Sequence, residues 1–448
     1  MFNYLKYNIP APRYTSYPTI PFWNNKIKKS DEWFTMVKES FSKTNKKEGI
    51  HLYVHLPFCE NLCTYCGCNR YITKNHSVEE FYVNAILKEW EMYLKNFSEI
   101  PIIREFHLGG GTPTFFHSEQ LERLVNGILN SAEMPKQHDY SFEGHPDNTM
   151  NEHLSSLSRL GFNRISLGIQ DFDPAVQKRI NRIQTVEQIK KITDDARSSG
   201  FTSVNYDLIY GLPSQNEKSI HLTMQKVSEL KPDRIAFYSY AHVPWLKPAQ
   251  KSLEPFLPSQ EVKMNLHLLG RKLLNEMGYK EVGMDHFALP EDELFTAFRE
   301  KRLNRNFMGY TPRASRLLIG LGASSISDAV TGFIQNVKEA KKYESEINNG
   351  ILPVITGHKL SDEDIKSRKQ IQEIMCSMET EIGEDEFFIQ DKFTKQLKTM
   401  EEDGLISVNG KKINVLEEGK LFLRNICLLF DRYYYKKSMK EKKFSQTV

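Results

Sequence analysis

The chain has 448 residues, of which 26% are charged and 40% are hydrophobic, and its formal net charge is +3. This length accommodates two or three domains and a large buried core. A charge so close to neutral argues against a nucleic-acid partner. Because no run of about 18 apolar residues is present, we expect no membrane-spanning helix and no membrane partner. Prolines interrupt the first residues where a secretory signal needs an apolar stretch, which predicts a cytoplasmic location.

Residues 1–48 are rich in proline and aromatic residues, and we expect them to be irregular. After them, short apolar runs alternate with patterns typical of amphipathic helices. We expect strands over 51–56, 105–111, 139–146, 163–170, 203–211 and 234–243, and helices over 77–96, 118–131, 150–160, 174–180, 186–199 and 215–230. This alternation predicts βαβ units in a parallel sheet, and six repeats suit an α/β fold with a partial (β/α)6 TIM-like barrel.

The pattern weakens after about residue 245. We expect a helix over 259–277, a strand within 279–288 and a turn-rich segment over 317–327 that packs on the barrel mouth. Farther on, the pattern predicts helices over 361–378 and 384–402, a hairpin at Asn409-Gly410 and a last helix over 417–437. Helices followed by a short hairpin indicate a winged-helix-like module. The expected organisation is an N-terminal lid over 1–48, a barrel with an extension over 49–355 and a mostly helical C-terminal domain over 356–448.

Four of the six cysteines lie between Cys59 and Cys68, in the stretch CENLCTYCGC. Clustered cysteines in a long intracellular chain bind metal more often than they form disulfides. A structural zinc site closes all four ligand positions, usually with a second pair of cysteines or with histidines at ligand spacing. The CxxxCxxC part instead offers three thiolates, which leave one iron of a 4Fe–4S cluster open to a substrate such as S-adenosylmethionine. The spacing favours this iron–sulfur interpretation over zinc. Cys376 and Cys427 stand alone in apolar helical surroundings, which predicts buried thiols.

Polar or glycine residues recur where the predicted strands end. They are Gly109 to Thr112, Glu143, Gln170, Asp207 and the pair Ala241-His242. In α/β barrels the carboxyl ends of the strands form the active site. Each of these residues alone is more typical of an ordinary strand end, and it is their convergence at one end of the predicted barrel that indicates a site.

The motifs together resemble those of a known family. The stretches that carry the resemblance are PRYTSYPT (12–19), LYVHLPFCENLCTYCGCN (52–69), HLGGGTPT (107–114), GFNRISLGIQDF (161–172), NYDLIYGLP (205–213), GMDHFA (283–288), RNFMGYT (305–311) and LRNICLLFDRYY (423–434). They look like the radical S-adenosylmethionine superfamily and, within it, the oxygen-independent coproporphyrinogen III oxidases. The resemblance runs over nearly the whole chain.

The resemblance implies a fold of the radical S-adenosylmethionine type and an oxidoreductase of haem biosynthesis that converts two propionates of coproporphyrinogen III to vinyl groups, giving protoporphyrinogen IX. It further implies a 4Fe–4S cluster, two molecules of S-adenosylmethionine, a reduced flavodoxin- or ferredoxin-type electron donor and a monomeric protein. Cys59, Cys63 and Cys66 would ligate the cluster, whereas Cys68 would not. Tyr53, Glu143 and Asp207 would act in catalysis, and the cofactor sites would be lined by Tyr53, Tyr65, Gly110, Gly111, Thr112, Glu143, Gln170, Arg182, Asp207, Ala241 and Ile326.

Two departures from the family pattern leave room for rival functions. Gly144-His145-Pro146 follows Glu143 where enterobacterial-type members tend to have Val-Asp-Pro, and Met308 stands where glutamine is frequent. A haem chaperone and a haem-degrading relative therefore remain alternatives, and a zinc-stabilised nucleic-acid-binding protein is an alternative of another class. The candidate anchors for the substrate carboxylates are Lys6, Arg13, Arg70 and His242.

Overall fold

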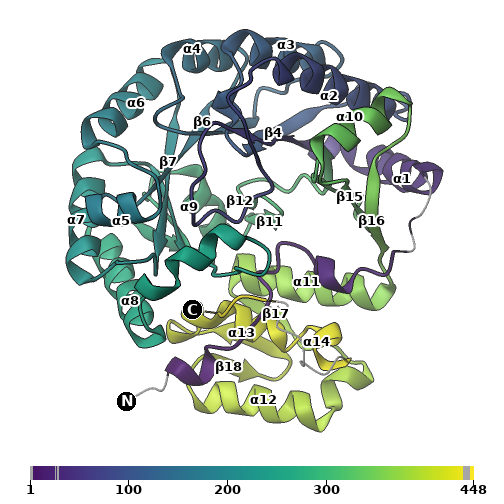
Figure 1. The fold of residues 1–448 in the computed structure, drawn as a ribbon. Helices are drawn as coiled ribbons and strands as arrows, with labels where there is room; N and C mark the ends of the chain where they lie inside the picture. The colour runs from purple at the N-terminus through teal and green to yellow at the C-terminus, as the bar shows by residue number, and fades with distance from the viewer. Residues whose placement is uncertain (1–3, 26, 28–29, 437–443, 448) are drawn as a thin grey trace.

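The computed structural model describes residues 4–25, 27, 30–436 and 444–447 (Figure 1). Six parallel strands stand side by side in chain order: β1 (Ile50–Leu56), β4 (Ile103–Gly110), β5 (Asp139–Gly144), β6 (Arg164–Gln170), β7 (Ser203–Tyr210) and β8 (Arg234–Ser239). Each pair of neighbours is parallel. The six strands predicted from the sequence are thus confirmed, together with their parallel order.

Helices cover the outer side of this curved sheet, as Figure 1 shows. They are α2 (Val78–Leu94), α3 (Ser118–Leu129), α4 (Asn151–Arg159), α5 (Pro174–Arg179), α6 (Val186–Ser198) and α7 (Glu217–Leu230). In α3 the buried residues are Leu121, Leu124, Val125 and Ile128, which are spaced i, i+3, i+4 and i+7. This spacing forms one apolar stripe, so α3 packs on the sheet and leaves its polar residues outside.

The sheet continues beyond both edges of the parallel set, to twelve strands in all. Next to β1 come β13 (Leu317–Leu321), β14 (Ile326–Asp328), β15 (Gly332–Asn336) and β16 (Val354–Lys359), and next to β8 come β10 (His286–Ala288) and β9 (Lys280–Val282). The expectation of a turn-rich segment over 317–327 was wrong, because β13 is a fully buried strand parallel to β1. A short, apolar, doubly buried strand has no alternation to reveal it. The strand expected within 279–288 is instead a hairpin of two.

The expectation that residues 1–48 are irregular was also wrong, because α1 (Ser30–Glu48) is a helix of 19 residues. It buries Trp33, Phe34, Val37 and Phe41, which lie on one face. Before α1, only the 3-10 turns η1 (Tyr4–Tyr7) and η2 (Ile20–Phe22) interrupt the extended chain of the described residues. The irregular chain expected over residues 1–48 is therefore found only before α1.

In the sequence, several elements outside the twelve-stranded sheet separate β8 from the C-terminal module. They are η4 (Pro248–Phe256), α8 (Gln260–Glu276), α9 (Glu293–Arg299), the hairpin of β11 (Asn304–Asn306) and β12 (Gly309–Thr311), and α10 (Ala340–Asn348). The predicted helix over 259–277 is confirmed by α8. Within the described residues, no helix is both long enough and apolar enough to cross a membrane.

The C-terminal module combines helices with a small sheet. Its helical elements are α11 (Asp362–Ser377), η5 (Glu386–Ile389), α12 (Asp391–Glu402), η6 (Glu418–Phe422), α13 (Leu423–Leu428) and α14 (Arg432–Lys436), and its strands are β17 (Glu379–Glu381), β18 (Ile406–Asn409) and β19 (Lys412–Val415). The predicted hairpin is confirmed, because Asn409 pairs with Lys412 and Gly410 adopts a φ of 61°. The helices expected over 384–402 and 417–437 are each broken into shorter pieces, and residue 437 lies outside the described residues.

The N-terminal segment packs on this module rather than on the barrel alone. Tyr7, Tyr14 and Tyr17 belong to the same hydrophobic core as the module's helices. Pro10 and Gln446 form an antiparallel bridge, so the two ends of the described chain lie side by side (Figure 1). The barrel has a separate core.

Candidate functional site

A pocket opens where the parallel strands end, at the carboxyl edge of the sheet. Its volume is about 260 Å³, near the lower end of the range for small-molecule sites. Eleven of the residues predicted from the sequence line it: Cys59, Cys63, Tyr65, Cys66, Gly110, Gly111, Thr112, Glu143, Gln170, Arg182 and Asp207. The other lining residues are Glu60, Asn61, Gly67, Cys68, Arg70, Pro113, Gly144, His145, Asn148, Ser166, Gly168 and Tyr238. The structure therefore brings together segments that are more than 170 residues apart in the sequence.

The cysteine loop is held at both ends. At its base, the short strands β2 (Phe58–Cys59) and β3 (Tyr71–Ile72) pair in parallel, and the Thr73 N–H donates to the Cys59 carbonyl at 2.9 Å. At its far end, the Thr64 N–H donates to the Ile180 carbonyl at 3.1 Å, just past α5. A loop fixed at base and tip presents its thiols in one arrangement, which a ligand site needs.

Each of the three predicted ligand thiols accepts a hydrogen bond. Thr112 Oγ1 donates to Cys59 Sγ at 3.3 Å, Arg182 Nη1 to Cys63 Sγ at 3.6 Å, and the Cys68 N–H to Cys66 Sγ at 3.4 Å. Hydrogen bonds of this kind stabilise thiolate ligands and tune the potential of iron–sulfur clusters. The donors come from three different segments, so the set is assembled only by the fold.

Three thiols of the loop have shifted pKa values. A side-chain hydrogen bond with Cys68 is the largest influence on Cys66 and lowers the pKa of that thiol to about 6. The same side-chain hydrogen bond raises the pKa of Cys68 well above its ordinary value. Burial raises the pKa of Cys59 to about 11. Cys68 thus stabilises the Cys66 thiolate while keeping its own proton. Cys68 is exposed, whereas Cys59 is buried.

The donor set of the loop fits a 4Fe–4S cluster. Cys59, Cys63 and Cys66 line one pocket, and each accepts a hydrogen bond. In a 4Fe–4S cluster each cysteine binds a different iron, so three thiolates leave the fourth iron open to a ligand in the pocket.

The glycine run after β4 lies directly against the start of the cysteine loop. The Gly111 N–H donates to the Leu56 carbonyl at 2.8 Å, and the Thr112 N–H to the Phe58 carbonyl at 2.9 Å. A Cβ atom on Gly111 would lie 2.6 Å from the Pro57 carbonyl oxygen, a distance that real Cβ atoms do not adopt. The absence of a side chain is therefore what lets the two segments meet and leaves the backbone open to the pocket.

Two carboxyl groups on neighbouring walls of the pocket have opposite pKa shifts. Burial raises the pKa of Glu143, but the hydrogen bond and charge of His107 and the Gly110 N–H outweigh it, so the net pKa is lowered. The Gly110 N–H lies 3.1 Å from Glu143 Oε2. Burial and the charge of Glu143 raise the pKa of Asp207 to about 7. One carboxylate is thus ionised at neutral pH while the other holds a proton half of the time, a pattern typical of functional sites.

Gln170 and Arg182 adopt constrained positions. Gln170 has a φ of 71°, a left-handed conformation that is uncommon for a residue other than glycine, and it stands at an irregularity in the β6–β7 pairing. Strained backbone of this kind concentrates at functional sites. Arg182 is buried and donates to the Gly168 carbonyl at 3.0 Å, which aims the rest of its guanidinium at Cys63.

Three predicted residues do not line this pocket. Tyr53, in β1, lies behind it, with its hydroxyl 2.9 Å from His55 Nδ1 and its ring stacked on His107. Ala241 follows β8, and its carbonyl accepts a hydrogen bond from Gln250 at 3.3 Å. Ile326 begins β14 on the other side of β1 and packs against the small cluster around Trp23.

Comparison with known proteins shows the family. Residues 53–227 match the model of the Radical SAM superfamily. The oxygen-independent coproporphyrinogen III oxidases of Synechocystis sp. and Escherichia coli are 37% and 35% identical to this chain, and each alignment covers 99% of this chain and 97% of the relative. The chain belongs to the oxygen-independent coproporphyrinogen III oxidases. A solved structure of the Escherichia coli coproporphyrinogen III oxidase, described as a radical SAM enzyme, matches with a TM-score of 0.86 and 35% identity over 94% of this chain and 97% of that one.

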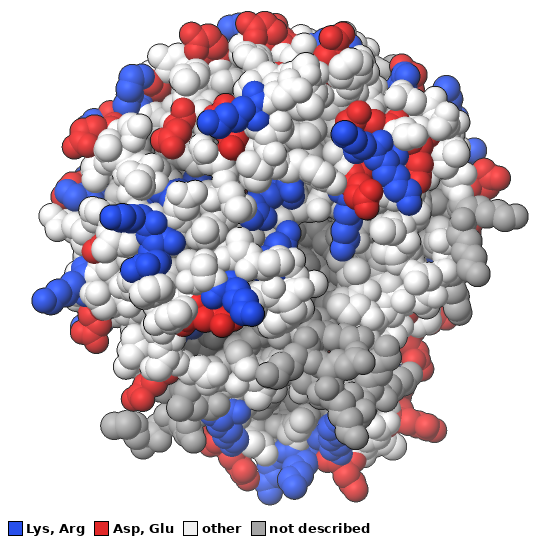
Figure 2. Space-filling view, in the orientation of Figure 1, with Lys and Arg blue, Asp and Glu red and all other residues white. Residues whose placement is uncertain are grey.

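This membership confirms the predicted fold class and favours the oxidase over the rival functions. The alignments to the oxidases include the N-terminal segment and the C-terminal module. On the face seen in Figure 2, the basic side chains of the described residues are interspersed with acidic ones.

Sequence reasoning missed several pocket residues of the oxidase. Ser166 and Tyr238 line the pocket from within β6 and β8, and Ser166 donates to Asp207 Oδ2 at 3.0 Å. Ser166, Gly168 and Gln170 alternate along β6, so the period of two in a strand could have pointed to Ser166. His145, one of the departures, lines the pocket, and burial lowers the pKa of its imidazole to about 3. Met308, the other departure, lies outside the lining.

The four candidate anchors divide according to their partners. Arg70 lines the pocket. Arg13 donates to Asp285 and to the Ser239 carbonyl at the end of β8, with its guanidinium 5.9 Å from the centre of the Tyr238 ring. Lys6 forms an ion pair with Asp403 in the C-terminal module. His242 lies 3.3 Å from Glu254 and does not line the pocket.

Proposed function

We propose that this protein catalyses the oxygen-independent oxidative decarboxylation of two propionates of coproporphyrinogen III to vinyl groups, giving protoporphyrinogen IX. In each half-reaction the propionate side chain loses a hydrogen atom from its β-carbon, then carbon dioxide and one electron. The observation that supports the proposal most directly is the pocket in which the CxxxCxxC loop, the glycine run and the strand-end carboxyl groups meet. The membership of the chain in the oxidase family supports the substrate.

Cys59, Cys63 and Cys66 would hold a 4Fe–4S cluster. When bound, the cluster and S-adenosylmethionine supply one-electron cleavage of a carbon–sulfur bond, which yields the 5′-deoxyadenosyl radical that takes the hydrogen atom. The protein's own contribution is to hold the three sulfur atoms with hydrogen bonds from Thr112, Arg182 and the Cys68 backbone.

The walls of the pocket would bind S-adenosylmethionine. Glu143, ionised at neutral pH, would accept hydrogen bonds from the ammonium group or the ribose hydroxyls, and Asp207 would accept others once it loses its proton. Gly110 and Gly111 would let the backbone approach the ligand closely. The resemblance implies a second S-adenosylmethionine, and the two cofactor sites would share the eleven predicted residues, of which Tyr53, Ala241 and Ile326 lie outside this pocket.

The N-terminal segment would act as the lid over the substrate. Arg13 is the part of it that supports this role, because its contacts with Ser239 and Tyr238 bring a cation to the edge of the pocket. A guanidinium there suits a propionate carboxylate. Exchange of Arg13 for glutamine should lower turnover of coproporphyrinogen III and leave cleavage of S-adenosylmethionine in place; unchanged turnover would remove Arg13 from the role.

The electron donor would be a reduced flavodoxin- or ferredoxin-type protein that docks at the cysteine loop. Lys247 Nζ donates to the Cys68 carbonyl at 2.6 Å, and the Asn69 side chain donates to the carbonyl of exposed Lys338. In the part of the chain that the structure describes, no carboxylate lies within ion-pair distance of Arg70, Lys247 or Lys338. Unpaired cations beside a redox centre suit an acidic donor.

The monomeric state stays a prediction from the resemblance. Division of the chain at about residues 48 and 355 stays a prediction, because α1 packs in the barrel core and the core of the module also contains residues between Met264 and Tyr310. The cytoplasmic location stays a prediction from the sequence.

The test is an anaerobic assay of the reduced, cluster-loaded protein with coproporphyrinogen III and S-adenosylmethionine. It should give the divinyl product and two molecules of carbon dioxide for each porphyrinogen. Formation of 5′-deoxyadenosine with neither product would reject the oxidase and point to a haem-degrading or haem-binding relative. A colourless protein after anaerobic reconstitution with iron and sulfide would reject the cluster itself.

A further inference from the structure

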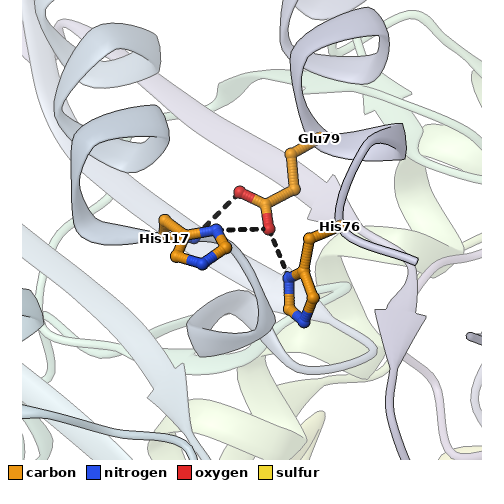
Figure 3. A group of neighbouring side chains, drawn as sticks. All are labelled: His76, Glu79 and His117. Atoms are coloured by element: carbon orange, nitrogen blue, oxygen red, sulfur yellow. Dashed lines mark hydrogen bonds and ion pairs between the residues drawn. The ribbon is translucent and has the colours of Figure 1, made fainter. Parts of the chain in front are cut away.

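A second group of metal-ligating side chains lies outside the ligands of the cysteine loop. His76 precedes α2, Glu79 lies in the first turn of α2, and His117 directly precedes α3. Their ligand atoms all lie within 4.8 Å of one another, and among the described residues no other group of His, Cys, Asp or Glu meets this condition. Figure 3 shows the two imidazole rings facing the same carboxylate.

The geometry of the group centres on one oxygen atom. His76 Nδ1 lies 2.6 Å and His117 Nδ1 lies 2.9 Å from Glu79 Oε1. The other carboxylate oxygen accepts the backbone N–H of His117 at 2.9 Å. Glu79 is 2% exposed, whereas the His117 side chain is 63% exposed, so one side of the group opens to solvent. An ion can therefore reach the group from the side of His117, where it would replace the two hydrogen bonds to Glu79 Oε1.

The surroundings of His76 hold its ring in a ligand orientation. His76 Nε2 lies 3.4 Å from Glu60 Oε1, and the ring stacks on Phe115 with centroids 4.4 Å apart and an interplanar angle of 12°. Metal-ligating histidines almost always donate the N–H of the other ring nitrogen to a carboxylate, a backbone carbonyl or water. The contact with Glu60 is on the ring nitrogen that does not face Glu79, and it leaves Nδ1 directed at Glu79.

We propose that His76, Glu79 and His117 form a binding site for a divalent metal ion of the zinc class. Two imidazoles and one carboxylate are a donor set that zinc uses with a fourth position left open. Hydrogen bonding alone could also explain the contacts of Glu79, because both rings can donate to it. What favours a metal is that two rings from different segments direct their Nδ1 atoms at one oxygen, while one of them is oriented from behind by Glu60.

An ion at this place would join three segments. Glu79 and His76 fix the start of α2, His117 fixes the start of α3, and Glu60 directly follows the predicted cluster ligand Cys59. The ion would therefore stabilise the base of the cysteine loop by binding the folded state alone. This inference does not depend on the proposed reaction, and its test reads metal binding rather than turnover.

The test uses the full chain with its cluster already loaded, so that the cluster ligands are occupied. Titration calorimetry with Zn²⁺ should show one site in addition to the cluster. X-ray absorption at the zinc edge should show nitrogen and oxygen neighbours at about 2.0–2.1 Å and no sulfur at about 2.3 Å. A sulfur shell would assign the zinc to a cysteine, and the absence of binding would reject the site outright.

Variants distinguish zinc binding at this site from zinc binding at other histidines. His117→Ala removes an exposed ligand with little effect on folding. It should weaken zinc binding more than 100-fold, because loss of a direct ligand should cost more than loss of an orienting partner, which costs about 10- to 100-fold. Exchange of Glu60 for glutamine should weaken it about tenfold. Exchange of His221, an exposed histidine on α7, should leave it unchanged. Equal affinity in His117→Ala and in the unaltered protein would overturn the proposal.

Discussion

The barrel and the C-terminal module bury similar apolar side chains, but the strands of their sheets run in different relative directions. In the barrel the six central strands are parallel, so their carboxyl ends meet at one edge and their loops converge on one pocket. In the module the three strands are antiparallel, so successive ends alternate between two edges. Strand direction, rather than composition, thus decides where reactive side chains can gather.

The cysteines show this difference most clearly. Cys63 and Cys66 are partly exposed in the barrel loop, and Cys66 has a lowered pKa. In the module Cys376 and Cys427 are buried, and burial raises the pKa of Cys376 to about 12. A thiol binds metal as the thiolate, so the module's cysteines are poor ligands although they are the same residue.

The largest effect should follow from exchange of one barrel cysteine. Cys66→Ser removes a ligand whose thiolate the fold stabilises, so the visible absorption of the cluster and cleavage of S-adenosylmethionine should both be lost. Cys376→Ser, the matched change in the module, should keep both. Absorption spectra after anaerobic reconstitution check this. Cys68→Ser should also keep its cluster, and loss of the cluster there would overturn the division of the loop into three ligands and one supporting thiol.

A smaller effect should follow from exchange of a pocket carboxylate. Glu143→Gln keeps the shape of the side chain but removes its charge, so cleavage of S-adenosylmethionine should fall about 100-fold, as when one prearranged electrostatic partner is lost. The cluster spectrum should not change. Glu384, an exposed carboxylate of the module paired with Lys411, provides the control. Equal loss in Glu384→Gln would mean that the effect is one of general charge.

The pH dependence of cofactor binding should be smaller still. Asp207 has a pKa of about 7, so it is mostly protonated at pH 6 and mostly ionised at pH 8. A cationic ligand binds the ionised form better, so the affinity for S-adenosylmethionine should rise as the pH increases, by up to about tenfold for each pH unit below 7. Equilibrium binding measured from pH 6 to pH 8 checks this. Asp207→Asn should bind more weakly and without this dependence; a slope that persists in the variant would assign the titration to another group.

The smallest effect on chemistry should come from a large change in the module's core. Phe393 is 1% exposed and packs against Phe387, Phe388 and Phe430. Phe393→Ala should lower the free energy of unfolding by about 3–5 kcal/mol, because it leaves a cavity. Cluster absorption at low temperature should stay unchanged. Loss of the cluster in this variant would show that barrel and module do not act as separate units, contrary to their separate cores.

The sequence predicts the repeating part of this fold well. The six parallel strands and the helices between them have periods of two or of 3.6, which a single chain displays directly. It does not reveal β13, because a doubly buried strand has no alternation, or α1, because neighbouring prolines suggest irregular chain. The breaks within 384–402 and 417–437 depend on packing against other elements, which no local pattern contains.

The residues of the candidate site also fall into two groups, those that a local pattern reveals and those that only the folded chain reveals. Residues that belong to recognisable motifs, such as Cys59 or Gly111, could be predicted and do line the pocket. Ser166 could have been predicted only from its alternation with Gly168 and Gln170 along β6, and no local motif marks Tyr238. Arg182, the donor to Cys63, is more than 100 residues from its acceptor, so only the folded chain pairs the two.

The pairing of the two chain ends has a consequence for the order of assembly. Tyr7 and Tyr14 dock on partners near residue 430, and Pro10 pairs with Gln446. At about 5–20 residues per second, a ribosome completes those partners roughly 20 to 90 seconds after it has made the first residues. During that interval the barrel can fold while the partners of Tyr14 and Pro10 in the last residues have not yet been made. The cysteine loop can thus receive its cluster before the N-terminal segment docks on the module, and a nascent chain stalled before residue 423 should accept the cluster as readily as the finished protein.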